Sequence, residues 1–215
     1  MKPHRAKVLV VGCPRSGTMF TAVLLQALGL DVRHEAMGYD GAVSWREAKG
    51  KPFSYRRVKI DGSVESGPVE FEHVFHQVRA PLPTIASMST MGPQAWRYIY
   101  RTISTVDPQA STLLRSMQLW HFMNQKFECQ AERTFRIEDI DVVLRGLCEI
   151  LGIRYSKRAL KSVPRNVNAR EHPGVGWADL FTADSKLTTD ISDMAGRYGY
   201  EHDPDDMFID KGGNP

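Results

Sequence analysis

The sequence predicts an α/β protein in which a central, mostly parallel sheet is flanked by helices. Short apolar runs typical of buried strands alternate along the chain with longer segments whose apolar residues recur at helical spacing. The first strand leads through a glycine-bearing turn into a helix, as the units of parallel sheets begin. With 215 residues, 42% of them hydrophobic, the chain has the size and composition of one globular domain over residues 1–215.

The elements are expected in alternating order from the amino terminus. Strands are predicted at residues 7–12, 31–35, 55–63, 73–80 and 133–139. Helices are predicted at residues 18–30, 82–91, 94–105, 109–131, 141–152 and 184–198. Residues 164–176 are rich in turn formers and are expected to form one long loop.

Cysteine usage and hydropathy limit where the protein works. Cys13, Cys129 and Cys148 are odd in number and lie in apolar or helical contexts, so a disulfide framework is not expected and a reducing compartment is. The apolar run before Gly12 is too short for a secretory signal. No segment approaches the roughly 20 apolar residues of a membrane span, so the sequence predicts a cytoplasmic protein without a membrane partner.

The net charge of +3 is a mild excess that does not imply a nucleic-acid partner. The charge is nevertheless uneven, because residues 154–170 contain no acidic side chain. The six basic residues of this run are Arg154, Lys157, Arg158, Lys161, Arg165 and Arg170. Two interpretations remain open: a solvated basic face, or a positively charged wall for an anionic ligand.

The turn after the first strand has the frame of a nucleotide phosphate loop without its lysine. Gly12 and Gly17 have the G-x-x-x-x-G spacing, but Thr18 and Met19 follow where Lys and then Ser or Thr would stand. A loop that opens a helix still offers backbone N–H groups and the positive end of the helix dipole to an anion.

The missing lysine changes which anion is expected. Without it, and without an obvious carboxylate to organise Mg²⁺, cleavage of a triphosphate would lack its usual charge neutralisation. Arg15 and Ser16 supply a cation and a hydroxyl from inside the loop instead. The sequence therefore favours a monophosphate or a mixed sulfate-phosphate group.

The segment "PRSGTMF" resembles the 5′-phosphosulfate loop of sulfotransferases that use 3′-phosphoadenosine-5′-phosphosulfate (PAPS). That loop has a Pro, a basic residue, Ser-Gly-Thr and then a second Thr or Ser, so only Met19 departs from it. The resemblance implies a P-loop-like sulfotransferase fold, closest in motif to the tyrosylprotein and bacterial enzymes. It assigns donor binding to Pro14, Arg15, Ser16, Gly17, Thr18 and Met19.

A second segment, "HQVRAPLPTIASMST", resembles the 3′-phosphate site of the same family. Arg79 ends a predicted strand, and Ser87 follows eight positions later (87 − 79 = 8) on a helix that Pro81 is suited to begin. A guanidinium fork and a helical hydroxyl can converge on one phosphate. Two such anion sites suit a nucleotide with phosphates at opposite ends of its ribose. ATP does not have that shape.

Transfer to an alcohol requires a base for the acceptor proton, and three residues are candidates. "GLDVRHE" is similar to the segment that carries a catalytic glutamate in tyrosylprotein sulfotransferases and bacterial relatives, which implies that role for Glu35. His34 is the adjacent rival, and strand alternation predicts that its side chain points away from that of Glu35. His76 lies in a predicted buried strand, where a satisfied core histidine is the simpler interpretation.

Other polar residues have weaker assignments. Asp61 and Ser63 lie where a strand opens into a loop, and either approach the acceptor or make a turn. The segments "RTFRIEDI" and "SMQLWHFMNQ" resemble fold markers of the family, with Trp120 and Phe122 expected in the core. The carboxylates expected to cap the helix that follows "RTFRIEDI" are Glu138 and Asp139.

The loop "PRNVNAREHPGVGW", residues 164–177, occupies the position of the family's cofactor-covering loop. It either closes over the nucleotide or stays on the surface without a contact. The residues expected to contact the nucleotide in the first case are Arg165, Asn168, Arg170 and Trp177.

Taken together, the resemblance implies transfer of a sulfuryl group from PAPS to a hydroxyl, or to an amine, of a small molecule, glycan or peptide. Adenosine 3′,5′-bisphosphate (PAP) would be the product, with Arg15 and Glu35 catalytic and no metal required. Two alternatives remain open. One is an atypical P-loop kinase, and the other is a non-catalytic nucleotide-binding protein on the same fold.

Overall fold

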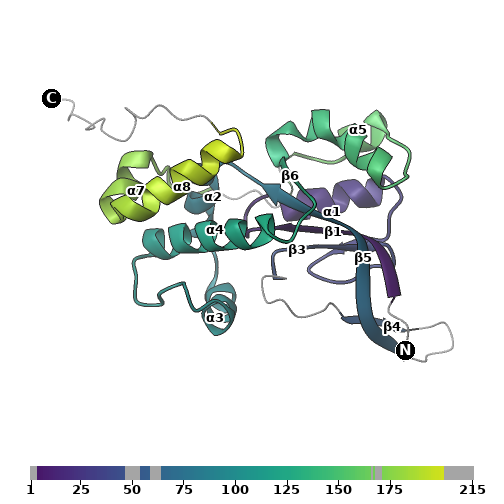
Figure 1. The fold of residues 1–215 in the computed structure, drawn as a ribbon, viewed down its shortest axis with the longest axis horizontal. Helices are drawn as coiled ribbons and strands as arrows, with labels where there is room; N and C mark the ends of the chain where they lie inside the picture. The colour runs from purple at the N-terminus through teal and green to yellow at the C-terminus, as the bar shows by residue number, and fades with distance from the viewer. Residues whose placement is uncertain (1–3, 47–53, 59–63, 166, 168–170, 201–215) are drawn as a thin grey trace.

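The computed structural model describes residues 4–46, 54–58, 64–165, 167 and 171–200. Its centre is a sheet of parallel strands in the order β2-β3-β1-β5-β6, and β4 pairs antiparallel with the first half of β5 (Figure 1). The predicted α/β class with a mostly parallel sheet is therefore confirmed. The strands are β1 His4–Gly12, β2 Val32–His34, β3 Gly41–Ser44, β4 Ser54–Val58, β5 Val64–Val78 and β6 Arg133–Arg136.

Helices cover both faces of this sheet (Figure 1). They are α1 Thr18–Ala27, α2 Pro81–Met88, α3 Pro93–Thr102, α4 Thr112–Glu128, α5 Ile140–Ile150, α6 Lys157–Ser162, α7 Trp177–Ala183 and α8 Ser185–Arg197. A single 3-10 turn, Ile137–Asp139, joins β6 to α5. No helix within these described ranges combines the length and apolar character that crossing a membrane requires.

Alternation along β1 divides the apolar residues between two cores. Val8 and Val10 face one side, where they pack with residues of α1, α5 and α6. Leu9 and Val11 face the other side, where α2, α3, α4, α7 and α8 gather. A strand that is apolar on both faces must be covered on both faces, so the run "VLVV" accounts for the central place of β1.

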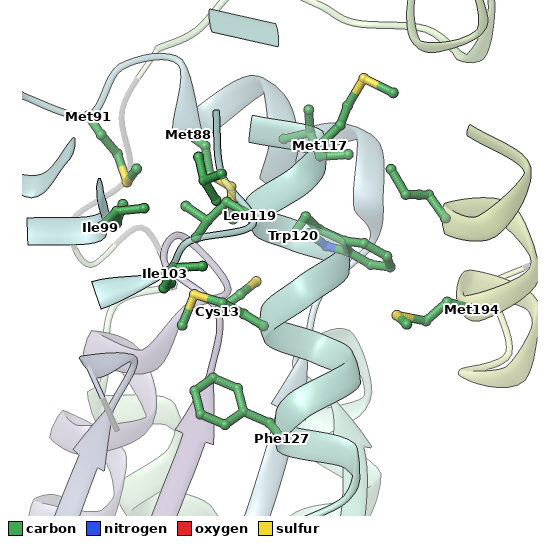
Figure 2. Close-up of a cluster of buried hydrophobic side chains, with 14 of the residues drawn as sticks. Cys13, Met88, Met91, Ile99, Ile103, Met117, Leu119, Trp120, Phe127 and Met194 are labelled. Atoms are coloured by element: carbon green, nitrogen blue, oxygen red, sulfur yellow. The ribbon is translucent and has the colours of Figure 1, made fainter. Parts of the chain in front are cut away.

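The second of these cores surrounds α4 (Figure 2). Trp120 projects from α4 toward α8, on which Met194 lies, and Cys13, directly after β1, belongs to the same cluster. Trp120 is fully buried, and Phe122 is partly buried against the same core. The expected core position is confirmed for Trp120, whereas Phe122 packs against the edge of the core. The cluster anchors the end of β1, which is where the phosphate loop begins.

The structure corrects several predicted elements. The strand expected at 55–63 is β4, which is antiparallel and ends at Val58, and residues 59–63 lie outside the described ranges. The strand expected at 73–80 is the end of β5, which begins at Val64. β3, α6 and α7 were not predicted. Elements of four to seven residues complete too few periods to be recognised from an apolar repeat.

Candidate active site

A cleft of about 750 Å³ opens at the carboxyl ends of the parallel strands. Ligands bind at this edge in open α/β sheets. The cleft is lined by the loop after β1, by the last residue of β2, by residues after β3, β5 and β6, and by α2 and α3. No group of three or more His, Cys, Asp or Glu side chains among the described residues is placed to hold a metal ion.

The loop between β1 and α1 has a tightly folded backbone. Gly17 has a φ of 90°, and Arg15 has a φ of 68°, which is unusual for a residue with a side chain. A Cβ on Gly12 would lie 2.7 Å from the Gln77 carbonyl oxygen. The loop therefore needs both of its glycines, one for close approach to β5 and one for the turn into α1. Pro14, Arg15, Gly17, Thr18 and Met19 line the cleft.

Ser16 supports this loop from behind. Its side chain is fully buried and its Oγ donates to the Cys13 carbonyl oxygen at 2.7 Å. Gln77 Nε2 donates to the Ser16 carbonyl oxygen at 2.5 Å, and Thr21 Oγ1 donates to Gln77 Oε1. The sequence placed the Ser16 hydroxyl on the anion, whereas the structure uses it to hold the loop to the sheet, and Ser16 is not part of the cleft wall.

Arg79 and Ser87 reach the same cleft from the end of β5 and from α2. Arg79 Nη1 donates to the Arg15 carbonyl oxygen at 3.1 Å, so the predicted second anion site adjoins the first. Pro81 occupies the first position of α2, as predicted, and Ser87 is 6% exposed on the cleft side. The structure thus brings together the two segments that the motifs singled out.

Glu138 lines the cleft beside these residues, and no motif predicted this position. It accepts hydrogen bonds from the Ala80 N–H at 3.0 Å and from the Tyr200 hydroxyl at 2.7 Å. Burial, aided by this carboxylate, raises the pKa of Tyr200.

The capping role predicted for Glu138 and Asp139 is wrong. Asp139 instead accepts a hydrogen bond from Arg136 Nε at 2.6 Å, and neither side chain caps α5. Both carboxylates accept hydrogen bonds from donors outside α5.

His34 and Glu35 lie together at the end of β2, and not on opposite sides as alternation predicts. Glu35 has a φ of 57°, which ends the extended geometry and turns its side chain back beside that of His34. His34 Nε2 lies 3.6 Å from Glu35 Oε1. The Glu35 N–H donates to the Val43 carbonyl oxygen at 3.0 Å, which fixes this turn against β3.

The two side chains differ in what surrounds them. Glu35 accepts from Ser44 Oγ at 3.1 Å and from the Trp45 N–H at 2.8 Å, and its Oε2 lies 3.5 Å from Arg46 Nε. Burial raises the pKa of Glu35, against the opposing effect of these hydrogen bonds. Glu35 is absent from the cleft wall, so its carboxylate serves first to hold the turn after β3.

His34 faces the cleft and the phosphate loop. Its Nε2 lies 3.0 Å from Thr18 Oγ1, within hydrogen-bond distance of the first residue of α1. Burial lowers the pKa of His34, and the nearby Arg46 lowers it further. The imidazole is therefore neutral at neutral pH and can accept a proton.

His76 is a buried core histidine, as the simpler interpretation predicted. It is fully buried, its Nε2 lies 3.1 Å from Asn124 Oδ1, and its Nδ1 lies 3.3 Å from Thr134 Oγ1. Burial lowers the pKa of His76 to about 4. Asn124 Nδ2 also donates to Cys13 Sγ at 3.9 Å, so this network supports the phosphate loop from below.

Three residues that no motif predicted form the aromatic end of the cleft. The rings of Trp45 and Tyr98 meet edge to face, with centroids 5.5 Å apart and planes at 90°. The Arg46 guanidinium lies over both rings, 5.6 Å from the Trp45 centroid and 5.4 Å from that of Tyr98. The one available hint in the sequence was a Trp-Arg pair shortly after the second strand.

The segment predicted to cover the cofactor divides in two. Arg165 lines the cleft, lies 5.4 Å from the Phe20 ring centroid and pairs with Asp141. Trp177 instead begins α7, is 6% exposed and belongs to the core, so its predicted contact with the nucleotide is wrong. An aromatic side chain on an amphipathic helix gains more from burial there than from a place on a loop.

Four residues with predicted contacts lie outside the described ranges, namely Asp61, Ser63, Asn168 and Arg170.

Most of the described basic run is a solvated face. Arg165 is its only described member in the cleft wall. The exposed members outside that wall are Arg154, Lys157, Arg158 and Lys161.

Comparison with known proteins bears on the fold. Neither a family model nor a curated protein matches the sequence. Among solved structures, the sulfotransferase domain from the curacin biosynthetic pathway matches with a TM-score of 0.54 and 13% identity, over 94% of this chain and 100% of that one. The chain therefore has the sulfotransferase fold that the motifs implied.

Two further sulfotransferases match at lower similarity. The domain from the Synechococcus PCC 7002 olefin synthase gives a TM-score of 0.49 and 12% identity, covering 94% of this chain and 97% of that one. Mouse sulfotransferase SULT7A1, solved in complex with PAP, gives 0.41 and 10%, covering 94% of this chain and 79% of that one.

Proposed function

We propose that this protein is a sulfotransferase that moves a sulfuryl group from PAPS to the hydroxyl of an acceptor. The observation that carries the proposal is the convergence on one cleft of the phosphate loop, the Arg79 and Ser87 pair, and His34. The sulfotransferase fold supports the reaction class. An amine is the second acceptor chemistry that the same site would serve.

The residues present fit a nucleotide with two separate anionic groups. The loop from Pro14 to Met19 would hold the phosphosulfate, since it lines the cleft and leads into the amino terminus of α1. Arg79 and Ser87 would hold the 3′-phosphate. PAPS, when bound, supplies the activated sulfuryl group and the leaving phosphate.

Arg15 is assigned the role of stabilising the negative charge that grows on the leaving oxygen. Its carbonyl oxygen accepts a hydrogen bond from Arg79 Nη1 at 3.1 Å, which ties the two halves of the donor site together. A positive charge fixed in place before the reaction stabilises developing negative charge without reorganisation. This supports the catalytic role predicted for Arg15.

Two residues are candidates for the base, Glu35 as the resemblance implies and its neighbour His34. The geometry favours His34, since it lines the cleft, is within 3.0 Å of the phosphate loop and is neutral at neutral pH. Glu35 already accepts hydrogen bonds on both carboxylate oxygens. We therefore assign the base to His34 and the positioning of His34, Trp45 and Arg46 to Glu35.

The transfer then balances as a single displacement. The acceptor oxygen forms a bond to sulfur while the bond from sulfur to the donor's bridging oxygen breaks, and that electron pair leaves on the phosphate. The acceptor proton passes to Nε2 of His34, the ring nitrogen that lies 3.0 Å from Thr18 Oγ1 in this structure. His34 returns the proton to solvent after the products leave.

The experiment compares ligands before it measures turnover. PAP at about 100 times its Kd should stabilise the fold by roughly 2.7 kcal/mol and raise the Tm without metal. Stabilisation only by ATP with Mg²⁺ would favour the kinase alternative. Tight PAP binding without sulfate transfer from radiolabelled PAPS to any alcohol, phenol, sugar or amine would favour the non-catalytic alternative.

A further inference from the structure

The order of the strands divides the cleft into two halves, and this division rests on the proposed function. The phosphate loop follows the central strand β1, while β5 and β6 lie on one side of it and β3 and β2 on the other. A nucleotide held by Arg79 and Ser87 would lie on the β5 side of the loop, because Arg79 directly follows β5 and Ser87 is on the next helix, α2. The loop with Arg79 and Ser87 is therefore called the donor half, and His34, Trp45, Arg46 and Tyr98 are called the acceptor half.

The described walls of the acceptor half are aromatic. Trp45 and Tyr98 present two rings at right angles, and the apolar side chains of Met91 and Ala95 line the same cleft. The Tyr98 hydroxyl donates to the Arg46 carbonyl oxygen at 3.2 Å, which fixes α3 to the end of β3. Tyr98 therefore offers its ring to a ligand, because its hydroxyl is already engaged.

The charge in the acceptor half is already balanced. The Arg46 guanidinium lies over the two rings, and its Nε is 3.5 Å from Glu35 Oε2. An anionic acceptor would have to compete with Glu35 for Arg46, close to a donor that is itself strongly negative. This favours an uncharged acceptor over one that carries carboxylates or phosphates.

We infer that the acceptor is a small, uncharged aromatic alcohol, a phenol or naphthol, whose ring lies against Trp45 and Tyr98 with its hydroxyl toward His34. Rings in perpendicular or offset contact attract one another by about 0.5–1.5 kcal/mol beyond the area they bury. A sugar would need several hydrogen-bonding side chains, whereas the two side chains shown to meet in this half of the cleft, Trp45 and Tyr98, present rings.

The chemistry of the base agrees with this acceptor. A histidine whose pKa is lowered by burial is a weak base. A phenolic hydroxyl loses its proton near pH 10, far more readily than an aliphatic alcohol, so a weak base suits a phenol. The acidity of the acceptor thus offsets the weakness of His34.

The test uses matched acceptors on the full chain saturated with PAP or PAPS. The probes are 2-naphthol, its saturated analogue decahydro-2-naphthol, glucose, and an acidic peptide containing one tyrosine. Binding to the PAP complex is measured by calorimetry, and transfer is measured with radiolabelled PAPS. We expect 2-naphthol to bind and to accept sulfate at least tenfold better, by kcat/KM, than each of the other three.

Variants connect that preference to the proposed wall. Trp45→Ala should weaken 2-naphthol binding at least tenfold while PAP affinity stays within twofold of the wild type. Phe181→Ala is the matched control, since this partly exposed aromatic side chain on α7 does not line the cleft. Tyr98→Leu, which keeps an apolar side chain, serves as a second variant should Trp45→Ala fail to fold.

The outcomes separate the inference from the function on which it rests. Preference for the saturated alcohol, the sugar or the acidic peptide would overturn the inference and leave the sulfotransferase proposal intact. So would 2-naphthol binding that neither variant weakens, or no binding of 2-naphthol to a protein that binds PAP. Failure to bind PAP would overturn the proposed function itself.

Discussion

The donor half of the cleft comes from two continuous segments, each a strand that runs into a helix, whereas the acceptor half is assembled from separate elements. Arg15 and Thr18 lie three positions apart in one loop, and Arg79 and Ser87 lie on one strand-helix connection. His34 ends β2, Trp45 follows β3, and Tyr98 belongs to α3. The difference teaches that anion binding can be specified locally, while the shape that selects an acceptor depends on how elements meet.

The largest expected effect separates chemistry from donor binding. His34→Ala should lower kcat for sulfate transfer to 2-naphthol by about 10²–10⁴, because the base for the acceptor proton is removed. PAP affinity, measured by calorimetry, should change far less than kcat, because Arg15, Arg79 and Ser87 are kept and His34 reaches the donor loop through Thr18 Oγ1.

Glu35→Gln is the matched variant for this experiment. The amide keeps the size of the side chain and one accepting oxygen, so the loss should be smaller than for His34→Ala. A loss of 10²–10⁴ in Glu35→Gln together with an active His34→Ala would transfer the base to Glu35. A pH profile alone does not distinguish them, because the lowered pKa of His34 and the raised pKa of Glu35 shift toward one another.

Acid should weaken the support beneath the donor half. The pKa of His76 is about 4 in the folded protein and near 6.5 when unfolded, so below pH 6.5 only the unfolded chain takes up this proton. Its contribution of about 3 kcal/mol is fully present above pH 6.5 and is lost as the pH falls toward 4.

Chemical denaturation between pH 7 and 4 measures this effect. His76→Gln should flatten the pH dependence of the free energy of unfolding over that range. His73→Gln is the control, since His73 lies on the same strand but pairs with Glu132 near the surface. An unchanged slope in His76→Gln would show that other groups cause the acid sensitivity.

Removing one contact to the 3′-phosphate should weaken binding of the nucleotide and leave acceptor binding nearly unchanged. Arg79→Ala should lower PAP affinity about ten- to a hundredfold, since a charge-assisted hydrogen bond contributes about 1.5–3 kcal/mol. The 2-naphthol KM at saturating PAPS should change little. Arg158→Ala controls for loss of a positive charge, because Arg158 is exposed on α6 and does not line the cleft. Equal PAP affinity in both variants would make Arg79 an ordinary surface arginine.

The smallest expected effect concerns the contact between α3 and the end of β3. Tyr98→Phe removes the hydrogen bond to the Arg46 carbonyl oxygen but keeps the ring, so unfolding should become easier by only about 0.5–1.5 kcal/mol. Sulfation of 2-naphthol should persist, with a modest rise in KM. Complete loss of activity would mean that the hydroxyl, and not the ring, serves the acceptor.

Much of the fold could be predicted because its strongest elements are local patterns. The run "VLVV" implied a strand covered on both faces, and the helix that became α4 was expected within a few residues of its ends. The strand that became β4 was predicted, but its antiparallel pairing was not, since pairing direction depends on residues distant in sequence. β3 was not predicted, because four residues complete too few periods of an alternating pattern.

Backbone conformation decided the arrangement of His34 and Glu35. An alternating strand predicted opposite directions, and the positive φ of Glu35 brought the two side chains together. A positive φ at a residue that is neither glycine nor asparagine cannot be recognised from the sequence. For the same reason the occluded position of Ser16 could not be foreseen, because it follows from contacts with Cys13 and Gln77 that only the folded loop creates.

The sequence by itself determined the donor half: the glycine frame of the loop, the missing lysine, and the spacing of Arg79 and Ser87, all of which act through neighbouring backbone. Only the tertiary structure decided the acceptor half. Trp45, Arg46 and Tyr98 meet because β3 lies beside β1 and α3 packs across its end. Side chains distant in sequence acquire a shared surface only when the sheet sets the order of its strands.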